Sequence, residues 1–443
     1  MKQNSLFSLF LLFVLFFILP TQFARAANGD LQELISLALT HNPRMEIARQ
    51  QINQARGQLT TSQAGYLPRV STGAGSTYTH IQDLVPEDED TVINVNINGT
   101  QLLYDFGKTR GRIDSVRHNL DAAGFNLKQT GHAIVFQVKQ AYYSLLEKIH
   151  LISVAEQSVA TYQRHLYRAQ KYFEAGVRTR IDITNAELEL ANARLDLLRA
   201  RSNAQIARTK LEQVTGISLK GQKDIPKTAV LPLTDMIKTL PELSPPLESL
   251  LKTARKKRPE LQQVTQQLKA AGAVIKQIKA EYWPTLSATA SYEDYETDLQ
   301  SFHDQWRIGA GLTWEIFSGF ETEGKLAEAR SKMLEINGRK NELELAVTQD
   351  VTDTFLRARE HRDGIKIADM AVKLAEKNLD LAEGRYKAGL GDMIEFNDAQ
   401  LSLTRSQSDL IGTYFSYLTA LAGIERATGT TPEPALELKK ILK

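Results

Sequence analysis

The stretch that decides the fold occurs twice, as YKAGLGDMIEFNDAQL at residues 386–401 and as YFEAGVRTRIDITNAEL at residues 172–188. In each copy a helical pattern ends at a glycine, Gly176 or Gly389, because glycine tolerates the left-handed conformation that closes many helices. The two glycines lie 213 residues apart. This interval indicates that one long unit is present twice.

Other landmarks repeat at nearly the same interval. A helix start with capping-box spacing follows each glycine, at residues 179–182 and 392–395. The remaining pairs are Asn42-Pro43 with Arg258-Pro259, Tyr66-Leu67-Pro68 with Tyr282-Trp283-Pro284, Gly107 with Gly319, and Thr215-Gly216 with Thr428-Gly429. The chain is therefore predicted to be a tandem duplication. Its parts are a first repeat at residues 27–219, a linker at 220–246, a second repeat at 247–429 and a tail at 430–443.

Composition and the first residues indicate an exported protein. Residues 1–26 have the pattern of a signal peptide, in which Lys2 precedes an apolar run and Ala24-Arg25-Ala26 offers a cleavage site. The 443 residues include no cysteine, which excludes disulfides and N-terminal lipidation. The net charge of +2 gives no electrostatic case for a nucleic acid partner.

In each repeat the hydrophobic period changes from that of a helix to that of a strand. The alternating residues of the first repeat are Ile93, Val95 and Ile97 on one face and Asn94, Asn96 and Asn98 on the other. Apolar residues alternate in the same way from Trp306 to Ile316, with Arg307 on the polar face. These patterns predict β-hairpins at about residues 68–106 and 284–317, with strands long enough to cross a bilayer. The alternative is a soluble hairpin packed on a core.

After each hairpin comes a long helical pattern, at residues 108–175 and 321–388, and then a shorter one at 179–215 and 392–427. At 1.5 Å per residue the longer helix measures about 100 Å, so it must lie against equally long neighbours.

Four membrane strands per chain cannot close a barrel, and open sheet edges are not tolerated in lipid. An eight-stranded barrel is filled by side chains, whereas three chains would give twelve strands around a lumen. The predicted fold is therefore a mixed α/β membrane protein, a trimeric 12-stranded β-barrel continued by an α-helical barrel. Asn94, Asn96, Asn98 and Arg307 are expected to face the barrel lumen.

The ordered double occurrence of these features resembles the TolC family of outer membrane efflux proteins. The resemblance covers residues 30–430, roughly, and includes the Tyr-x-x-Gly turns and the Asn185-Ala186 and Asp398-Ala399 steps. It implies a homotrimeric duct in the bacterial outer membrane, with a long periplasmic extension. It also implies two partners, a periplasmic adaptor (membrane fusion protein) and an inner membrane pump driven by protons or by ATP. The cargo would be small molecules in drug efflux or proteins in type I secretion.

The resemblance further implies a periplasmic gate. Glu395 and Asp398 match the acidic rings of the family. Tyr386 and Asp182 match a link in which a phenol donates a hydrogen bond to a carboxylate. Three copies of each acid would concentrate negative potential at a narrow axis and favour cations.

Two features leave alternatives at this gate. A linking arginine of the family is replaced by Gly391 here, so that link is either missing or supplied by Arg178 or Arg180. Asp392 and Glu395 have the spacing of residues that cap a helix and complement its dipole, which is an alternative role for both.

The sequence predicts no catalytic residues, cofactor or metal. The sequence of residues 319–326 is similar to that of a phosphate-binding loop, but Leu326 occupies the position where a Ser or Thr hydroxyl must hold magnesium. The eight histidines show no metal-ligand spacing. The competing interpretations of function are a periplasmic coiled-coil scaffold and a surface receptor barrel, neither with a transport role.

Overall fold

The computed structural model describes residues 31–81, 88–218, 237–238, 240–243, 245–296 and 303–431. The predicted signal peptide, most of the predicted linker and nearly all of the tail lie outside these ranges. The chain divides into two compact units. The first comprises Met1–Asn42, Ile134–Leu243 and Arg357–Ala422, and the second comprises Pro43–Ala133, Ser244–Leu356 and Gly423–Lys443.

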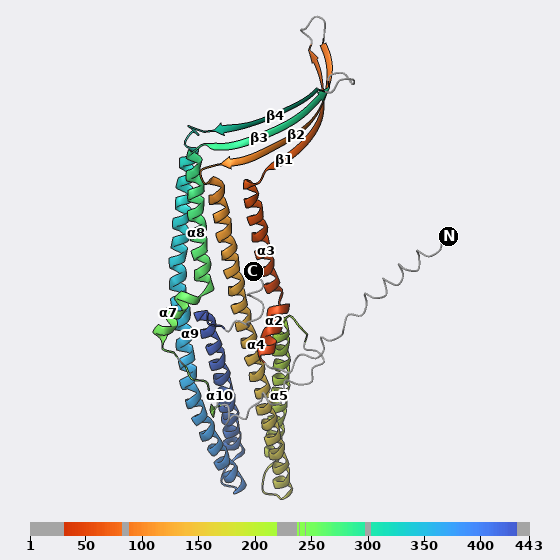
Figure 1. Ribbon diagram of the computed structural model, residues 1–443. Helices are drawn as coiled ribbons and strands as arrows, with labels where there is room; N and C mark the ends of the chain where they lie inside the picture. Colours follow the sequence, from red (N-terminus) through yellow and green to blue (C-terminus); the bar gives the residue numbers. More distant parts are fainter. Residues whose placement is uncertain are drawn as a thin grey trace, which may run out of the picture. The chain divides into compact units, whose positions relative to one another are not determined.

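The two repeats contain the same elements in the same order (Figure 1). The first repeat has α2 (Leu31–His41), α3 (Pro43–Gln63), η2 (Ala64–Tyr66), β1 (Arg69–Ile81), β2 (Asp88–Tyr104), α4 (Lys108–Glu174) and α5 (Arg180–Thr215). The second has α7 (Leu247–Lys257), α8 (Pro259–Lys279), η4 (Ala280–Tyr282), β3 (Thr285–Glu296), β4 (His303–Thr313), α9 (Glu321–Lys387) and α10 (Met393–Thr428). Corresponding helices have equal lengths of 11, 21, 67 and 36 residues. The predicted internal duplication is therefore confirmed.

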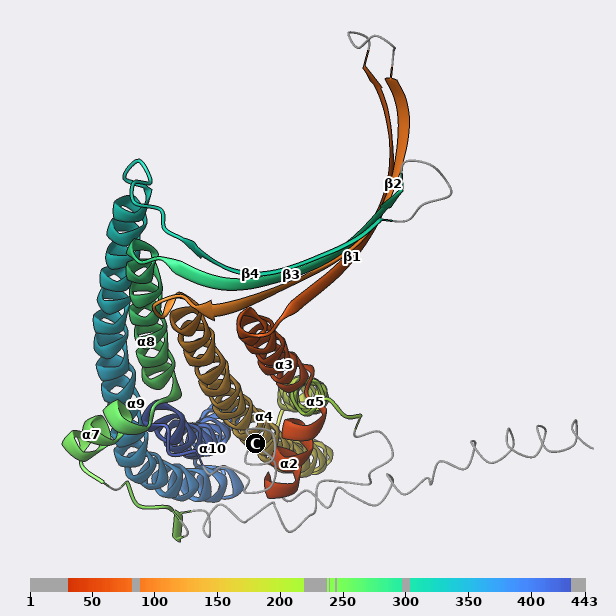
Figure 2. The ribbon, with the colours of Figure 1, turned by 45° about the horizontal axis from the view of Figure 1, so that its top comes forward.

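The strands of both repeats form one antiparallel sheet in the second unit, in the order β1-β2-β3-β4. The repeats meet where β2 pairs with β3, and Ile97 lies opposite Tyr292. The four strands curve together along their length (Figure 2). Within the described residues this arrangement confirms the predicted four-stranded sheet, and it leaves β1 and β4 as the edges.

The end of the last strand differs from the sequence prediction. Apolar alternation continues to Ile316, but β4 ends at Thr313, which pairs with Thr285, the first residue of β3. Pro284 precedes that residue and has no N–H to extend the ladder. The indole of Trp314 donates instead to the carbonyl of Tyr282 at 3.1 Å. The alternation therefore overestimates the strand by three residues.

Each unit contains the same contact between the start of one helix and the end of another. In the first unit, the Asn42 amide donates to the carbonyl of Val214 at 2.7 Å. In the second, the Arg258 guanidinium donates to the carbonyl of Ala427 at 3.4 Å. Arg258 is also paired with Asp350 at 2.8 Å. The duplicated contact thus has the same backbone acceptor and a different donor, neutral in one unit and charged in the other.

Candidate functional site at the helix turns

The turns between the long and short helices both belong to the first unit and close in the same way. Gly176 follows α4 and Gly389 follows α9, and each has a φ of 73°. The residue after each glycine donates its N–H to the carbonyl five residues before it, at 2.9 Å. This pattern satisfies carbonyls at the helix end. Both turns therefore have the same closed backbone conformation.

Aspartates cap the helices that follow the turns. The Asp182 carboxylate accepts two hydrogen bonds from Thr179, one from its N–H and one from its hydroxyl, each at 3.1 Å. The Asp392 carboxylate accepts the N–H of Glu395 at 2.9 Å. The capping role predicted for Asp392 is therefore confirmed.

Glu395 has a different partner. Its carboxylate lies 2.9 Å from Nε of Arg385, whose guanidinium also donates to the carbonyl of Leu390 at 3.2 Å. A Cβ atom at Gly391 would lie 2.9 Å from Oε2 of Glu395 and 3.1 Å from Cβ of Arg385. A side chain at Gly391 would therefore displace this ion pair, which gives a local reason for glycine there. The Glu395 side chain is held by Arg385 rather than by the helix N-terminus, but its place in the first turn of α10 still complements the helix dipole, as the alternative role predicts.

Arg178 connects the two turns. Its guanidinium donates to the carbonyl of Gly391 at 3.0 Å and lies 5.0 Å from the centre of the Tyr386 ring. Arg178 is half-buried, whereas Arg180 is exposed. Of the two arginines left open by the sequence, Arg178 is the one that reaches the second turn.

The predicted hydrogen bond from Tyr386 to Asp182 is absent. Tyr386 is 2% exposed, and its hydroxyl has no hydrogen-bond partner among the residues that the structure describes. The Asp182 carboxylate is engaged by Thr179 instead. Burial raises the pKa of Tyr386, the nearby Asp182 charge raises it further and Arg178 opposes both. The pair is thus close enough to interact through charge but is not joined.

His165 is a buried residue that the sequence analysis overlooked. It is 1% exposed and lies on α4, which forms one helix pair with α5; α9 and α10 form the other. The centre of its ring is 4.1 Å from that of Phe396 on α10 and 4.8 Å from that of Tyr386 on α9. The 3-4-3 spacing of Tyr162, His165, Ala169 and Tyr172 places it on the buried face of α4. This helical spacing is the sequence signal that could have identified His165 as buried.

Charged side chains flank this aromatic cluster. Arg168 on α4 pairs with Glu383 on α9, and Lys387 binds the same carboxylate at 2.9 Å. The hydrogen bond from Arg168 is the largest cause that lowers the pKa of Glu383, followed by that from Lys387. The pair of Arg168 and Glu383 adds an electrostatic contact between α4 and α9, whereas the pair of Lys387 and Glu383 lies within α9.

Asp398 stands apart from these contacts. It is exposed on the second turn of α10, and its side chain has no hydrogen bond or ion pair within the described ranges. Its counterpart in the first repeat is Asn185, which is half-buried. Asp398 is therefore a carboxylate whose charge no described residue pairs.

The sheet has one polar and one apolar face. Residues opposite each other in antiparallel strands point to the same side. The register places Asn98, Ser291 and Arg307 in one row and Ile97, Tyr292 and Trp306 in the next, and these two rows face opposite sides. The polar face carries the four predicted lumen residues, which are Asn94, Asn96, Asn98 and Arg307.

The apolar face is open to its surroundings. Trp306 is 69% and Ile308 is 77% exposed. An extended apolar surface of this kind marks contact with lipid or with another protein. On the polar face, Asn94 and Asn96 lie over Gly75 and Gly73 of β1, which leave space for the amides.

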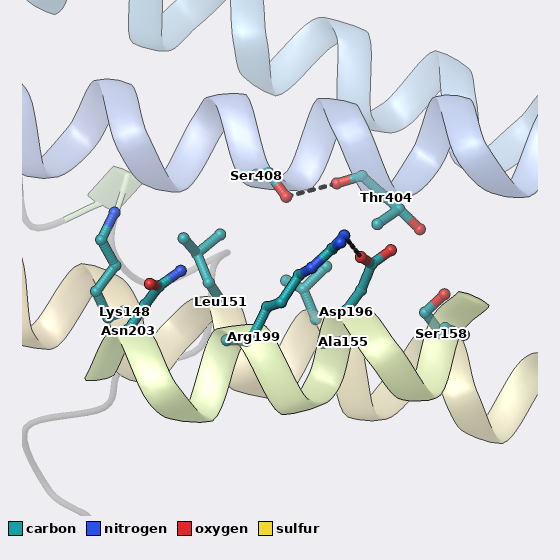
Figure 3. A pocket seen from close by; sticks show the side chains of 12 residues that line it. Lys148, Leu151, Ala155, Ser158, Asp196, Arg199, Asn203, Thr404 and Ser408 are labelled. Carbon is teal, nitrogen blue, oxygen red and sulfur yellow. Dashed lines mark hydrogen bonds and ion pairs between the residues drawn. The ribbon is translucent and has the colours of Figure 1, made fainter. Parts of the chain in front are cut away.

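A groove of about 280 Å³ lies between α4, α5 and α10 in the first unit (Figure 3). Its cations are already paired, Arg199 with Asp196 at 3.2 Å and Lys148 with Glu147 at 2.7 Å. Ser408 donates to the carbonyl of Thr404 across one turn of α10. The groove therefore offers no unpaired charge to a ligand.

Across the described part of the chain, no three His, Cys, Asp or Glu residues are grouped to hold a metal ion. None of the helices described here combines the length and the hydrophobicity that crossing a lipid bilayer requires.

Comparison with known proteins connects these features to one family. The family described as "Outer membrane efflux protein" matches residues 34–217 and 250–430, one segment in each repeat. The chain is 24% identical over 432 residues to the probable efflux pump outer membrane protein TtgC of Pseudomonas putida, covering 93% of this chain and 87% of that protein. It is 22% identical to the outer membrane protein TolC of Escherichia coli, covering 92% and 83% of the two chains.

A solved structure shares the fold. The CmeC outer membrane channel of Campylobacter jejuni superimposes with a TM-score of 0.79 at 15% identity. The match covers 93% of this chain and 88% of the CmeC chain.

Proposed function

The chain belongs to the outer membrane efflux protein family, and we propose that three copies of it form a passive exit duct across the bacterial outer membrane. The observation that carries this proposal is the sheet, whose apolar face is open and whose edges, β1 and β4, are unpaired in the described chain. Unpaired edges are not stable in lipid. Three sheets joined edge to edge give twelve strands, which is enough for an aqueous lumen.

The polar face of the sheet fits the lumen of such a barrel. Asn94, Asn96, Asn98 and Arg307 would line it, and the face that contains Trp306 would meet lipid. With this assignment, the exposed polar side chains face water and the exposed apolar side chains face lipid.

The helix turns fit a gate at the periplasmic end. Asp398 is the best candidate for an acidic ring, because its charge is not paired among the described residues, whereas Glu395 is paired with Arg385. Arg178 would hold the two turns together in the closed state. Tyr386 and Asp182 would support that contact through the buried aromatic cluster and the helix cap.

We propose small molecules as the cargo, because several relatives carry efflux pump names, among them an antibiotic efflux protein and a toluene efflux protein of Pseudomonas putida. A passive duct needs an energy source elsewhere. A periplasmic adaptor and an inner membrane pump, driven by protons or by ATP, would supply it.

Light scattering of the detergent-purified protein tests the assembly. The expected protein mass is about three times the 49.6 kDa of one chain. A mass of one or two chains would contradict the duct. Recovery from the periplasm without detergent would favour a coiled-coil scaffold instead. Loss of dye efflux in a deletion strain, restored by the gene, would separate a duct from a receptor barrel.

A further inference from the structure

His165 is a buried ionisable group in the first unit that the proposed duct does not explain. It is 1% exposed, and neither ring nitrogen has a hydrogen-bond partner within the described residues. Its ring lies between α4, which carries it, and the rings of Phe396 and Tyr386 from α10 and α9. We call the packing of these three rings the hairpin contact. A neutral imidazole fits this apolar setting, and an imidazolium does not.

The charged groups around His165 compensate a proton on its ring only in part. On α4, Arg168 repels a positive charge. On α9, Glu383 is already engaged by Arg168 and Lys387, and on α5, Asp182 is engaged by Thr179. The Tyr386 hydroxyl on α9 is neutral, and α10 contributes the ring of Phe396. A proton on His165 would therefore place an incompletely balanced charge between α4 and the helices α9 and α10.

Burial lowers the pKa of His165 from 6.5 to about 4, and Arg168 lowers it further, whereas Glu383 and Asp182 oppose the change. If separation of the helix pairs exposes the ring, its pKa returns toward the ordinary value. The separated state then binds a proton more strongly than the packed state. The hairpin contact is thus fully stable above about pH 6.5 and weakens as the pH falls toward 4.

We propose that His165 is an acid-sensitive switch, whose protonation loosens the hairpin contact and opens the constriction at the helix turns. The proposal rests on the duct function. With an ordinary pKa of 6.5 and a buried pKa of about 4, acidification from pH 7.5 to 5.0 shifts the equilibrium toward the open state by roughly thirty-fold per chain.

The test is single-channel recording of the purified full-length protein in planar bilayers at pH 7.5 and pH 5.0. The wild type should show a reversible rise in open probability at pH 5.0. This rise reflects a shift in the open-to-closed ratio of up to roughly thirty-fold per chain. His165→Phe keeps a ring but cannot be protonated, so it should match the wild type at pH 7.5 and lose the rise. His361→Phe is the matched control on α9, where the histidine is half-exposed, and it should keep the rise.

A second measurement leaves His165 in place, in case His165→Phe folds poorly. Ala169 is 0% exposed in the same cluster as Tyr386, and the chain has no cysteine. A single Ala169→Cys should react with a thiol reagent faster at pH 5.0 than at pH 7.5, once rates are divided by those of the exposed Val177→Cys. A ratio that does not change with pH would overturn the proposal.

The results of these experiments distinguish failure of the switch proposal from failure of the duct proposal. An equal acid response in His165→Phe and wild type, or a conducting wild type with no acid response, would overturn the switch and leave the duct intact. A wild type that conducts at neither pH would contradict the duct itself.

Discussion

Replacement of Arg178 by alanine should raise the resting conductance of the duct. Arg178 joins the two turns through a 3.0 Å hydrogen bond to the carbonyl of Gly391 and a 5.0 Å contact with the ring of Tyr386. Both contacts are lost in Arg178→Ala. The turns then keep the ion pair between Arg168 and Glu383 and the buried aromatic cluster, so the fold should persist.

The magnitude follows from these two contacts. A hydrogen bond to a charged group contributes about 1.5 kcal/mol at the lower end of its range, which suits a half-buried arginine. A cation–π contact at a partly exposed site adds about 0.5 kcal/mol. The loss of about 2 kcal/mol per chain corresponds to an increase of roughly 30-fold in the open-to-closed ratio.

Single-channel recording at neutral pH, without adaptor or pump, measures this ratio directly. Arg178→Lys keeps the charge but loses the planar donor geometry, so it should be intermediate. Arg180→Ala is the matched control, because Arg180 is exposed two residues away. An open probability for Arg178→Ala that stays equal to that of Arg180→Ala would refute the reasoning.

Three further predictions concern other parts of the chain. Asp398→Asn should lower cation selectivity and weaken block by multivalent cations, because each trimer loses three unpaired negative charges; unchanged selectivity in bilayer recordings would remove Asp398 from the pore. Tyr386→Phe should lower the free energy of unfolding by no more than about 0.5 kcal/mol, because its buried hydroxyl has no partner among the described residues. A larger loss in thermal denaturation would reveal a partner in the assembled trimer. Arg258→Ala should lower the unfolding free energy by about 2 kcal/mol, because the 7% exposed Arg258 loses a charged hydrogen bond to Asp350, which keeps its pairing with Arg426. The exposed Arg255→Ala should be neutral in the same denaturation series, and equal midpoints for the two variants would show that the pair contributes little.

The fold was predictable because its signals are periodic. Alternation over residues 93–98 requires two different faces, and one glycine spacing repeated through the chain requires a duplication. The pattern of alternating residues does not predict where a strand ends when the neighbouring strand decides its last pair. The strand that contains Trp306 stops at Thr313 because the proline before β3 removes the next donor.

The gate was less predictable, because one side chain can serve two neighbours. Asp182 matches both a capping box and a family link to Tyr386, and in the folded chain the cap engages its carboxylate. Arg178 and Arg180 could not be separated by spacing, since an irregular turn does not fix side-chain direction. His165 was missed because a polar residue on an apolar helix face is easily assigned to solvent.

The contact between Arg178 and Gly391 has a consequence for the history of the chain. The two residues lie 213 positions apart, so they occupy the same site in the two duplicated halves. A gene duplication begins with identical residues at such a pair of sites. Two arginines facing each other would repel, and two glycines would leave nothing to bridge the turns. At this pair of equivalent positions the halves have diverged, so that one copy supplies the guanidinium donor and the other supplies a carbonyl acceptor with no second positive charge beside it.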